Sequence, residues 1–359
     1  MTGLLQSKLI LGIKKILVLV HDAGGAELLS ALIHEYQDSY VWRVVTTANS
    51  PAHLIFIKGG LERFLNLYDP GQIAPGYFDS FSYDIVFFNP GWNAFPREIL
   101  PKLNLGRRKS AAFLEHWLDY RERFGYPEDG WRSALPDFTV VCDSKAYELA
   151  SNYDFQNVVK LKNYHLCNQR KQFEALTKQM EDESDTLLFL SQTVDDAEMC
   201  RQYDGNFTYI GHYEREAITG IVDNFEALTD CLGVHNLKIR LHPSKTEFGH
   251  QDVLQRIDVV KLEVERAQDK NLLESIAGAR VVVGMNSMAL FTSHLCGKPA
   301  ISFIPNESVK CTLPLQPEFC VHDISDILHI SWDVLNSGSR GIDLFPERNL
   351  EGLFKEIQE

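Results

Sequence analysis

Short apolar runs, each followed by a segment with helical spacing, recur along the whole chain. Residues 16–20 (Ile-Leu-Val-Leu-Val) and residues 281–284 (Val-Val-Val-Gly) are apolar at successive positions. A strand that is apolar on both faces must be covered on both faces, as the strands of parallel sheets are. The alternation of such strands with helices predicts parallel sheets joined by right-handed crossovers. The expected fold class is therefore α/β, with Rossmann-like doubly wound sheets.

The same patterns set the expected order of the elements. Strands are predicted at residues 13–20, 41–47, 83–89, 109–116, 137–143, 157–161, 186–191, 207–212, 236–241, 261–264, 281–284 and 299–304. Helices are predicted at residues 27–36, 50–68 with an interruption at Gly59-Gly60, 144–152, 214–232, 272–279 and 287–296. The residues after 325 are predicted to form one or two further helices.

The length of the chain predicts more than one domain. A chain of 359 residues is long for a single hydrophobic core. A polar stretch near residues 165–185 separates the two series of strands and helices. We therefore expect an N-terminal domain at residues 1–165, a linker at 166–184, a second domain at 185–325 and a C-terminal helical tail at 326–359.

Composition excludes some classes of partner. The net charge of −14 does not fit an extended nucleic-acid surface, which needs basic stripes. The seven cysteines are odd in number and form no Cys-x-x-Cys, which is typical of reduced thiols in a cytoplasmic protein. No apolar run approaches the ~20 residues of a membrane span, and residues 1–11 are too short and polar for a secretory signal. Basic clusters such as residues 107–109 leave peripheral contact with the inner face of a membrane open.

Two polar loops in the second half of the chain follow apolar strands. One is Arg240-Leu-His-Pro243, and the other is Asn286-Ser287-Met288, which opens a helix. Helix N-termini offer unpaired N–H groups and a favourable dipole to phosphate, and ligands of open parallel sheets bind at the carboxyl ends of strands. The two loops are therefore predicted to form two halves of a phosphate or nucleotide site. Gln192 and Thr193 end another strand of the same series.

Each of these residues also has a purely structural interpretation. His242 could cap a loop at the end of its strand, and Ser287 could be an ordinary helix N-cap. Arg240 lies two residues before His242 and shares its face of the strand, where an ion pair would account for it equally well.

A glycine pair follows the first predicted strand, in the sequence His-Asp22-Ala-Gly24-Gly25. Adjacent glycines let the backbone approach a ligand or a neighbouring element closely. The pattern is not the Gly-x-Gly-x-x-Gly fingerprint of dinucleotide sites, so no dinucleotide cofactor is expected. A tight turn without a ligand is the alternative.

Charged residues cluster where another apolar strand of the first half ends. Glu115 and His116 close that strand, and Asp119 follows three residues later. Carboxylates and histidines at the carboxyl ends of parallel strands can serve as general bases. An ion pair of Glu115 with Arg121 or Arg123 is the structural alternative. Two tryptophans, at positions 92 and 117, lie near the same strand ends and could stack on a sugar ring or pack in the core.

The combination of motifs in the second half resembles a group of bacterial enzymes. The pair formed by residues 240–243 and 286–287, with Gly-Lys-Pro at 297–299, is similar to the His-Pro and Ser motifs of capsule and lipopolysaccharide transferases. These include the polysialyltransferase and Kdo-transferase groups, which use CMP-activated acidic sugars. CDP-glycerol phosphotransferases and, more distantly, UDP-N-acetylglucosamine 2-epimerases show a similar pattern. The resemblance covers about residues 185–305, and the first half resembles the acceptor half of such enzymes.

This resemblance implies the GT-B fold, in which two Rossmann-like domains face a cleft. It implies a metal-independent glycosyltransferase that moves a sugar from a CMP-linked or, next, a UDP-linked donor to a bacterial surface polysaccharide or lipid-linked glycan. Donor-binding residues would be Gln192, Thr193, Arg240, His242, Pro243, Asn286, Ser287 and Met288. Catalytic residues would come from Asp22, Glu115, His116 and Asp119, and cleft residues would be Gly24, Gly25, Trp92 and Trp117.

Two alternatives stay open on the same scaffold. The first is a 2-epimerase-like isomerase or hydrolase. That group usually has Asp-Ser-Gly-Gly followed by helical acids, where this chain has Met-Asn-Ser-Met at 285–288 and then Ala-Leu-Phe-Thr-Ser-His-Leu. The loop therefore suits a phosphate better than a ribose. The second alternative is a non-catalytic nucleotide-binding protein. No Asp-x-Asp and no tight zinc spacing is present, so no metal is predicted.

Overall fold

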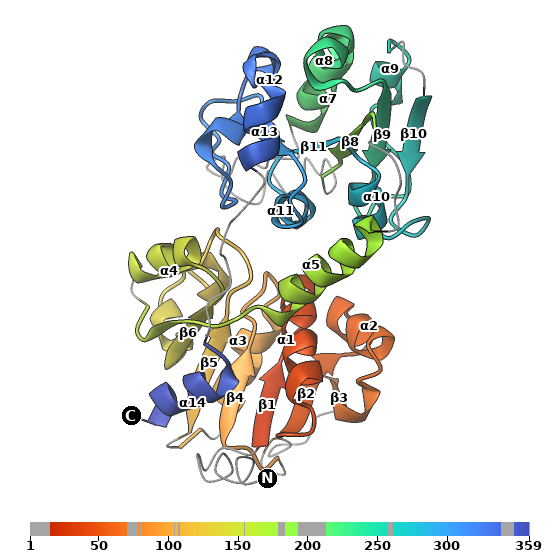
Figure 1. Cartoon of the computed structure of the whole chain (residues 1–359). Helices are drawn as coiled ribbons and strands as arrows, with labels where there is room; N and C mark the ends of the chain where they lie inside the picture. The colour runs from red at the N-terminus through yellow and green to blue at the C-terminus, as the bar shows by residue number, and fades with distance from the viewer. Residues whose placement is uncertain are drawn as a thin grey trace, which may run out of the picture. The chain divides into compact units, whose positions relative to one another are not determined.

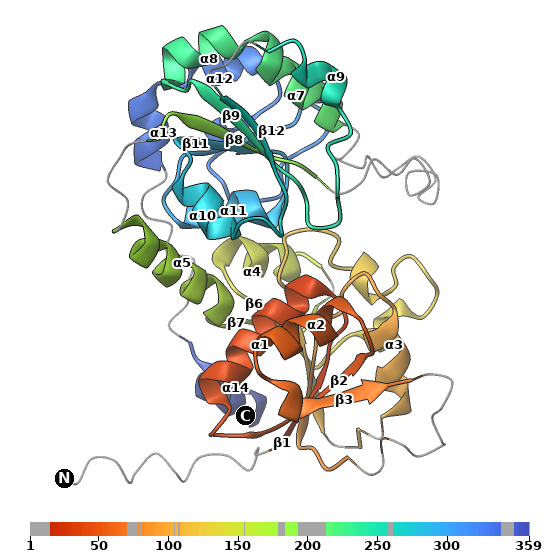
Figure 2. The same cartoon turned by 90° about the vertical axis from the view of Figure 1, so that its right-hand side faces the viewer.

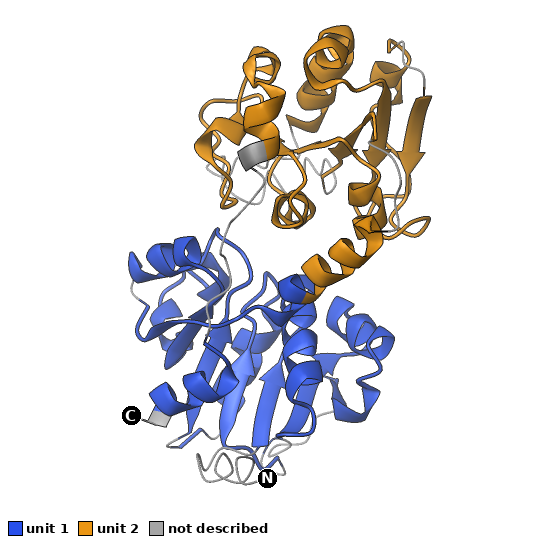
Figure 3. Cartoon of the chain, viewed as in Figure 1, with its two compact units in different colours: residues 1–167, 343–359 blue, residues 168–342 orange. Residues whose placement is uncertain are grey.

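The computed structural model describes residues 15–69, 78, 81–103, 105–106, 108–153, 155–178, 184–192, 213–257, 261–338 and 348–358. The chain divides into two compact units (Figure 3). Unit 1 comprises residues 1–167 and 343–359, and unit 2 comprises residues 168–342.

Within the described residues, unit 1 contains a seven-stranded parallel sheet in the order β3-β2-β1-β4-β5-β6-β7. Its strands are β1 (Lys15–Leu19), β2 (Val41–Thr47), β3 (Leu65–Tyr68), β4 (Ile85–Phe88), β5 (Lys109–Phe113), β6 (Phe138–Val141) and β7 (Val158–Lys160). The helices of this part are α1 (Ala23–Tyr36), α2 (Pro51–Lys58), α3 (Phe95–Ile99), α4 (Ser144–Ser151) and α14 (Leu350–Gln358). Helix α5 (Tyr164–Thr177) runs across the division between the units.

The described part of unit 2 contains a six-stranded parallel sheet in the order β10-β9-β8-β11-β12-β13 (Figure 1). Its strands are β8 (Thr186–Leu190), β9 (Asn236–Arg240), β10 (Lys261–Glu265), β11 (Val281–Gly284), β12 (Ala300–Phe303) and β13 (Cys320–Val321). Its helices are α7 (Glu214–Asp223), α8 (Phe225–Leu232), α9 (Gln251–Leu254), α10 (Leu272–Ala277), α11 (Met288–Leu295), α12 (Ile324–His329) and α13 (Trp332–Gly338).

The two sheets confirm the predicted fold class of two parallel-sheet α/β domains. In each, the first strand of the unit is central and the chain builds outward on one side before it reverses to the other. The reversal lies between β1 and β4 in unit 1 and between β8 and β11 in unit 2. In open α/β sheets, ligands bind at the carboxyl ends of the strands that flank this switch point.

Alternation of side chains explains how each sheet is covered on both faces. Along β1, Ile16 and Val18 join the core that α1 and α14 complete on one face (Figure 2). Leu17 and Leu19 are equally buried but point to the other face. There the ring of Phe124 packs edge-on against Phe88 of β4 at 6.2 Å.

Several element boundaries differ from the sequence prediction. Helix α1 begins at Ala23, four residues before the predicted start, so both glycines lie in its first turn. The helix predicted at 214–232 is divided into α7 and α8 at Asn224, whose φ of −117° is not helical. The helix predicted at 50–68 is wrong after Lys58, where α2 ends, because Leu65–Tyr68 form strand β3. The two-residue strand β13 is absent from the predicted strands. The strand predicted at 207–212 lies outside the described residues.

The C-terminal residues also differ from the predicted single tail. Ile327 of α12 and Leu335 of α13 belong to the core of unit 2. Helix α14 instead joins the core of unit 1, through Leu350, Leu353 and Phe354. Apolar residues of this helix thus cover a sheet whose last strand ends more than 180 residues earlier in the sequence. The spacing of residues within the helix does not reveal which sheet it covers. Among the described helices, none has the length and apolar content needed to span a bilayer.

Candidate functional site

The switch point of unit 1 is organised by the carboxylate of Asp22, which follows β1. Its Oδ2 accepts the backbone N–H groups of Trp92 at 2.6 Å and Asn93 at 3.2 Å, both in the loop after β4. Its Oδ1 lies 2.9 Å from Nδ1 of His21. Oδ2 of this predicted catalytic residue therefore joins the loops that follow β1 and β4, while Oδ1 is engaged by the adjacent His21.

Glycines at this edge make room for side chains from the neighbouring strands. A Cβ on Gly25 would lie 2.1 Å from Cγ of Asn89, and one on Gly91 would lie 2.1 Å from Oδ2 of Asp22. A Cβ on Gly24 would lie 3.1 Å from Cγ of Glu115. Gly24 and Gly25, predicted as cleft residues, thus let helix α1 approach the ends of β4 and β5 closely.

We predict that Gly25→Ala lowers the free energy of unfolding by about 1–3 kcal/mol or more, because the new methyl group would overlap the Asn89 side chain. Urea unfolding of the variant and the parent measures this change. Gly249→Ala is the control, since a Cβ there has nothing within 4 Å. Equal stabilities of the two variants would contradict the proposed close packing.

Glu115 is held in a buried polar network. Its Oε1 accepts from Nη1 of Arg123 at 2.9 Å, and its Oε2 accepts from Nδ2 of Asn89. Nδ2 of Asn89 also donates to the carbonyl of Phe113 at 2.8 Å. The ion pair that the sequence left open as an alternative is therefore formed, with Arg123. Asn89 was missed by the sequence analysis, and its place directly after an apolar strand was the available signal.

His116 and Asp119, the other predicted catalytic residues, carry unpaired atoms. Nδ1 of His116 and Oδ2 of Asp119 are buried without a hydrogen-bond partner among the described residues. Burial, and then the Arg123 charge, lower the pKa of His116 to about 4, so its ring is neutral at pH 7. Burial, and then Glu122, raise the pKa of Asp119 to about 6. Asp119 also has a φ of 53°, in the left-handed region that few non-glycine residues adopt.

The two predicted cleft tryptophans occupy different environments. Trp92 exposes 48% of its surface. Trp117 is buried and donates its Nε1–H to Oδ2 of Asp143 at 2.8 Å. This burial corrects the prediction that Trp117 faces a ligand, because its ring packs in the interior of unit 1.

In unit 2, Arg240 belongs to a buried ion pair. Its Nη1 donates to Oε1 of Glu265 on β10 and to Oγ of Ser275 at 2.9 Å, and its Nη2 donates to the carbonyl of Lys270 at 3.0 Å. Only 8% of the Arg240 side chain and 2% of the Glu265 side chain are exposed. These contacts correct the prediction that Arg240 assists a bound phosphate, because its guanidinium is already paired inside the unit.

His242 lies at the carboxyl end of β9 with a defined tautomer. The backbone N–H of Ser244 donates to its Nδ1 at 3.2 Å, and the Ser244 hydroxyl lies 2.8 Å from the same atom. Because Nδ1 accepts, a neutral ring carries its proton on Nε2. Burial, and then the Lys245 charge, lower the pKa of His242, which favours this neutral form. The ring therefore offers one N–H donor at Nε2.

Lys245 adds a positive charge beside His242 that the sequence analysis did not identify. Its Nζ donates to Oε2 of Glu214 at 2.6 Å and to Oγ of Ser191 at 3.2 Å. Ser191 follows β8, and its N–H donates to the carbonyl of Arg240 at 2.9 Å. These contacts join the ends of β8 and β9 with the start of α7. The position of Lys245 two residues after Pro243 was the only signal in the sequence.

The loop after β11 is closed by side chains. Oγ of Ser287 accepts the N–H of Leu290 at 3.2 Å, so Ser287 is the N-cap of α11. Asn286 makes two hydrogen bonds with Thr312. Its Oδ1 accepts the backbone N–H of Thr312 at 3.1 Å, and its Nδ2 donates to Oγ1 of Thr312 at 2.9 Å. The amides of Met288 and Ala289 open the helix, where no carbonyl within it can accept them.

The remaining predicted donor-site residues are placed as follows. Gln192 follows Ser191 at the end of β8, and its Nε2 is buried without a partner among the described residues. Pro243 is exposed beside His242. Thr193 lies outside the described residues. Gln192 and Ser287 thus flank the switch point between β8 and β11, and His242 follows the next strand of the sheet.

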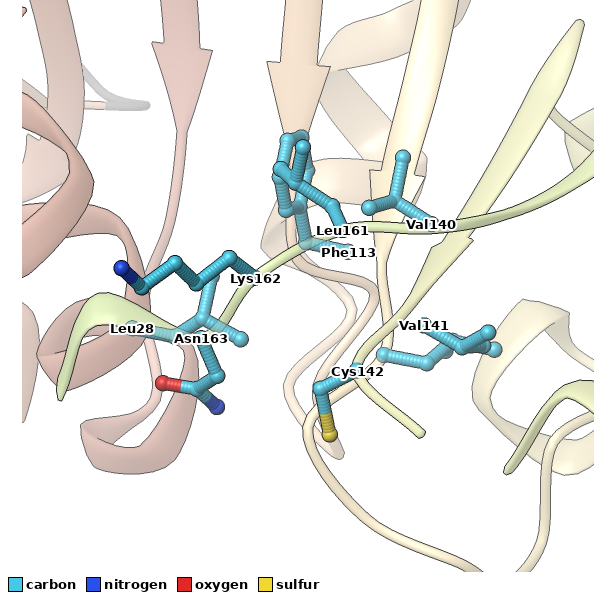
Figure 4. Close-up of a pocket in the computed structure, with 9 residues that line it drawn as sticks. Leu28, Phe113, Val140, Val141, Cys142, Leu161, Lys162 and Asn163 are labelled. Carbon is cyan, nitrogen blue, oxygen red and sulfur yellow. The ribbon is translucent and has the colours of Figure 1, made fainter. Parts of the chain in front are cut away.

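Unit 1 contains a pocket at the carboxyl ends of β5, β6 and β7 (Figure 4). It is lined mainly by apolar side chains such as Phe113, Val140 and Leu161, and the Lys162 ammonium extends away from them. The thiol of Cys142 lies 3.2 Å from Asp143, and burial raises its pKa well above the usual range. The pocket therefore offers an apolar lining, and the Cys142 thiol in it stays protonated at neutral pH. Among the residues that the structure describes, no group of three His, Cys, Asp or Glu is placed to hold a metal ion.

Comparison with known proteins identifies the fold. No family model matches the chain, and no curated protein matches it. Solved structures match it over nearly its whole length. UDP-GlcNAc 2-epimerase from Methanocaldococcus jannaschii has 13% identity and a TM-score of 0.63, covering 96% of this chain and 99% of that chain.

Two further structures agree. UDP-GlcNAc 2-epimerase from Neisseria meningitidis, bound to UDP-GlcNAc, has 13% identity and a TM-score of 0.62, covering 96% of this chain and 98% of that chain. The S. aureus MnaA–UDP structure has 12% identity and a TM-score of 0.60, covering 96% and 94%. The chain therefore has the GT-B fold of two parallel-sheet α/β domains.

Proposed function

We propose that the chain is a nucleotide-sugar enzyme, and that the carboxyl edge of the unit 2 sheet binds the diphosphate of its substrate. The observation that carries this proposal is the tautomer of His242, whose Nδ1 accepts from Ser244 and whose Nε2–H is left to donate. The N-terminus of α11, capped by Ser287, adds amide donors at the end of β11, and β8 lies between β11 and the strand that carries His242.

These groups suit a leaving phosphate. When the bond between the anomeric carbon and the phosphate oxygen breaks, negative charge develops on that oxygen. A neutral His donor, helix amides and the nearby Lys245 ammonium would stabilise this charge without a metal ion. Lys245 is already paired with Glu214, so it would act on the phosphate as the positive end of an ion pair and not as an unpaired cation.

The fold comparisons favour a UDP-linked sugar over a CMP-linked one, because the similar structures are named as UDP-GlcNAc 2-epimerases or were solved with UDP. We therefore propose 2-epimerisation of a UDP-sugar as the first reaction to test. Inverting carbon 2 requires that a proton leave that carbon on one face and return on the other. No carbonyl activates this proton, so it would leave together with the nucleotide, with a double bond forming between carbons 1 and 2. Return of a proton to the opposite face of carbon 2 and re-addition of UDP at carbon 1 would then complete the inversion.

A second candidate is the glycosyl transfer implied by the sequence motifs, and the described carboxylates of unit 1 favour it. Asp22 and Glu115 have both oxygens engaged, while Asp119 has an oxygen without a partner. A single carboxylate base suits removal of a proton from an acceptor hydroxyl, whereas epimerisation needs both a proton acceptor and a proton donor at carbon 2, and His116, with its unpaired Nδ1, would have to be the second group. The acceptor would be a glycan, such as a bacterial surface polysaccharide or a lipid-linked chain.

We predict that UDP or UDP-GlcNAc raises the melting temperature of the protein and that His242→Ala abolishes this rise. A ligand at ~100 times its Kd stabilises a protein by about 2.7 kcal/mol. Thermal-shift measurements with UDP, UDP-GlcNAc, CMP, CDP and GDP test this. His329→Ala, an exposed histidine on α12 of the same unit, is the control and should keep the full shift. If no nucleotide stabilises the parent protein, the proposed function is wrong.

Proton NMR of UDP-GlcNAc with the enzyme in deuterated water separates the reaction classes. Epimerisation predicts deuterium at carbon 2 and appearance of the manno isomer. Transfer predicts release of UDP only when a glycan acceptor is added, with no deuterium at carbon 2. Binding without either change would indicate a non-catalytic nucleotide-binding protein.

A further inference from the structure

Trp92 is an exposed aromatic residue on a loop that the rest of unit 1 holds in place. Three of the other four tryptophans, Trp42, Trp117 and Trp131, are buried, whereas Trp92 exposes 48% of its surface. Its backbone N–H donates to Asp22 at 2.6 Å. The preceding Gly91 has no room for a side chain, because a Cβ would lie 2.1 Å from the same carboxylate. The backbone that carries the ring is therefore held by contacts within unit 1.

The inner face of the ring is supported by a buried cation. The Arg123 guanidinium lies over the Trp92 ring, 5.4 Å from its centroid. Arg123 is 3% exposed, is paired with Glu115, and Glu115 is held in turn by Asn89. A buried charged pair is costly to assemble. Here the pair lies against an indole that exposes 48% of its surface.

The surroundings of the ring indicate what could lie on it. The loop after β5 carries both Arg123 and Asp119, and the backbone N–H of Arg123 donates to the backbone carbonyl of Asp119 at 3.1 Å. The Asp119 carboxylate has an oxygen without a hydrogen-bond partner among the described residues. Carboxylates accept hydrogen bonds from hydroxyl groups and repel phosphates. A pyranose ring has an apolar C–H face that fits an indole and hydroxyl groups at its rim that fit such acceptors.

We propose that Trp92 is the stacking platform of a pyranose-binding subsite at the carboxyl edge of the unit 1 sheet. This subsite would be where the proposed enzyme holds a sugar ring. Binding of a nucleotide-linked sugar at the subsite rests on the proposed function. The ring could be carried by a nucleotide or belong to a glycan acceptor, and the two share the same contact with the indole.

Acrylamide quenching of tryptophan fluorescence tests the subsite without any assay of activity. Trp332 of unit 2 is half-buried beneath the Arg280 guanidinium, so Trp92 is the most exposed of the five tryptophans. The probes are UDP-GlcNAc, UDP alone, and methyl glycosides of N-acetylglucosamine and glucose at millimolar concentration. We expect at least one sugar to protect the emission from quenching. Protection by UDP-GlcNAc but not UDP indicates a nucleotide-linked ring, and protection by a glycoside indicates an acceptor ring.

Two substitutions and a control complete the test. Trp92→Ala should weaken binding of the protecting sugar by roughly three- to tenfold, as loss of an aromatic stacking contact does, and Trp92→Phe should restore most of it. Both are measured by NMR line broadening of the sugar. Tyr147→Ala, on α4 and 39% exposed, should leave binding unchanged.

The failures of the subsite and of the proposed function are distinguishable. If UDP-GlcNAc stabilises the protein through His242 but no sugar protects Trp92, the subsite is wrong and the nucleotide site stands. If a glycoside protects Trp92 while no nucleotide binds, the subsite stands and the proposed function is wrong. Unchanged sugar affinity in Trp92→Ala would also overturn the subsite.

Discussion

Replacing Asp119 with asparagine should lower the rate of the proposed reaction by about 10²–10⁴-fold while leaving nucleotide binding intact, as expected for loss of a general base. Among the predicted catalytic residues, Asp119 combines a carboxylate oxygen without a partner, a left-handed backbone and a raised pKa. Turnover of UDP-GlcNAc or of the matching donor, measured beside the thermal shift with UDP, tests this expectation.

The pH dependence gives this assignment a second readout. A general base must be deprotonated, so the rate should rise with pH through about 6, the pKa to which burial and Glu122 raise Asp119. Glu122→Gln removes the second of these causes, and the rising limb should shift to lower pH with little change in the plateau rate. Asp119 would be excluded as the base if the pH at which the rate rises were the same in Glu122→Gln as in the parent. Full activity of Asp119→Asn would exclude it as well.

Removing the carboxylate of Glu265 should lower the free energy of unfolding by about 3–5 kcal/mol, because Arg240 would remain buried without its counter-charge. Both side chains are almost wholly enclosed, and Ser275 bonds to each of them. Urea unfolding of Glu265→Ala should show a lower midpoint with an unchanged dependence on urea concentration.

An exposed ion pair of unit 2 provides the control. Nη1 of Arg215 lies 3.0 Å from Oδ1 of Asp252, but 50% and 62% of the two side chains are exposed. Asp252→Ala should scarcely move the midpoint, because water and salt screen such pairs. If Glu265→Ala kept the parental stability but lost nucleotide binding, Arg240 would belong to the donor site after all.

Some features of this protein could be predicted from local patterns alone. Apolar runs such as residues 281–284 identify strands buried on both faces, and their alternation with helices indicates parallel α/β sheets. Polar residues directly after such runs identify the edge where ligands of this fold class bind. The places of His242 after a strand and of Ser287 at the start of a helix could be predicted in this way, because both features are visible in a few adjacent residues.

Local patterns could not show which polar groups are already engaged. Arg240 and His242 are two residues apart, yet Arg240 is paired with Glu265, 25 residues later, while Nδ1 of His242 bonds to the adjacent Ser244. Glu115 is likewise held by Asn89, 26 residues earlier. The partner of a buried charge is set by which strands become neighbours in the sheet, and strand order is a property of the whole chain.

The sequence by itself determined the fold class of this protein and the edge of each sheet where polar side chains collect, because both follow from spacing within one element. Only the tertiary structure decided which of those side chains remain available. It buried Arg240 and Trp117 and engaged both carboxylate oxygens of Glu115 and of Asp22. It left Trp92 exposed and Oδ2 of Asp119 without a hydrogen-bond partner among the described residues. The physical reason is that desolvation makes buried polar groups find partners, and those partners come from distant parts of the chain.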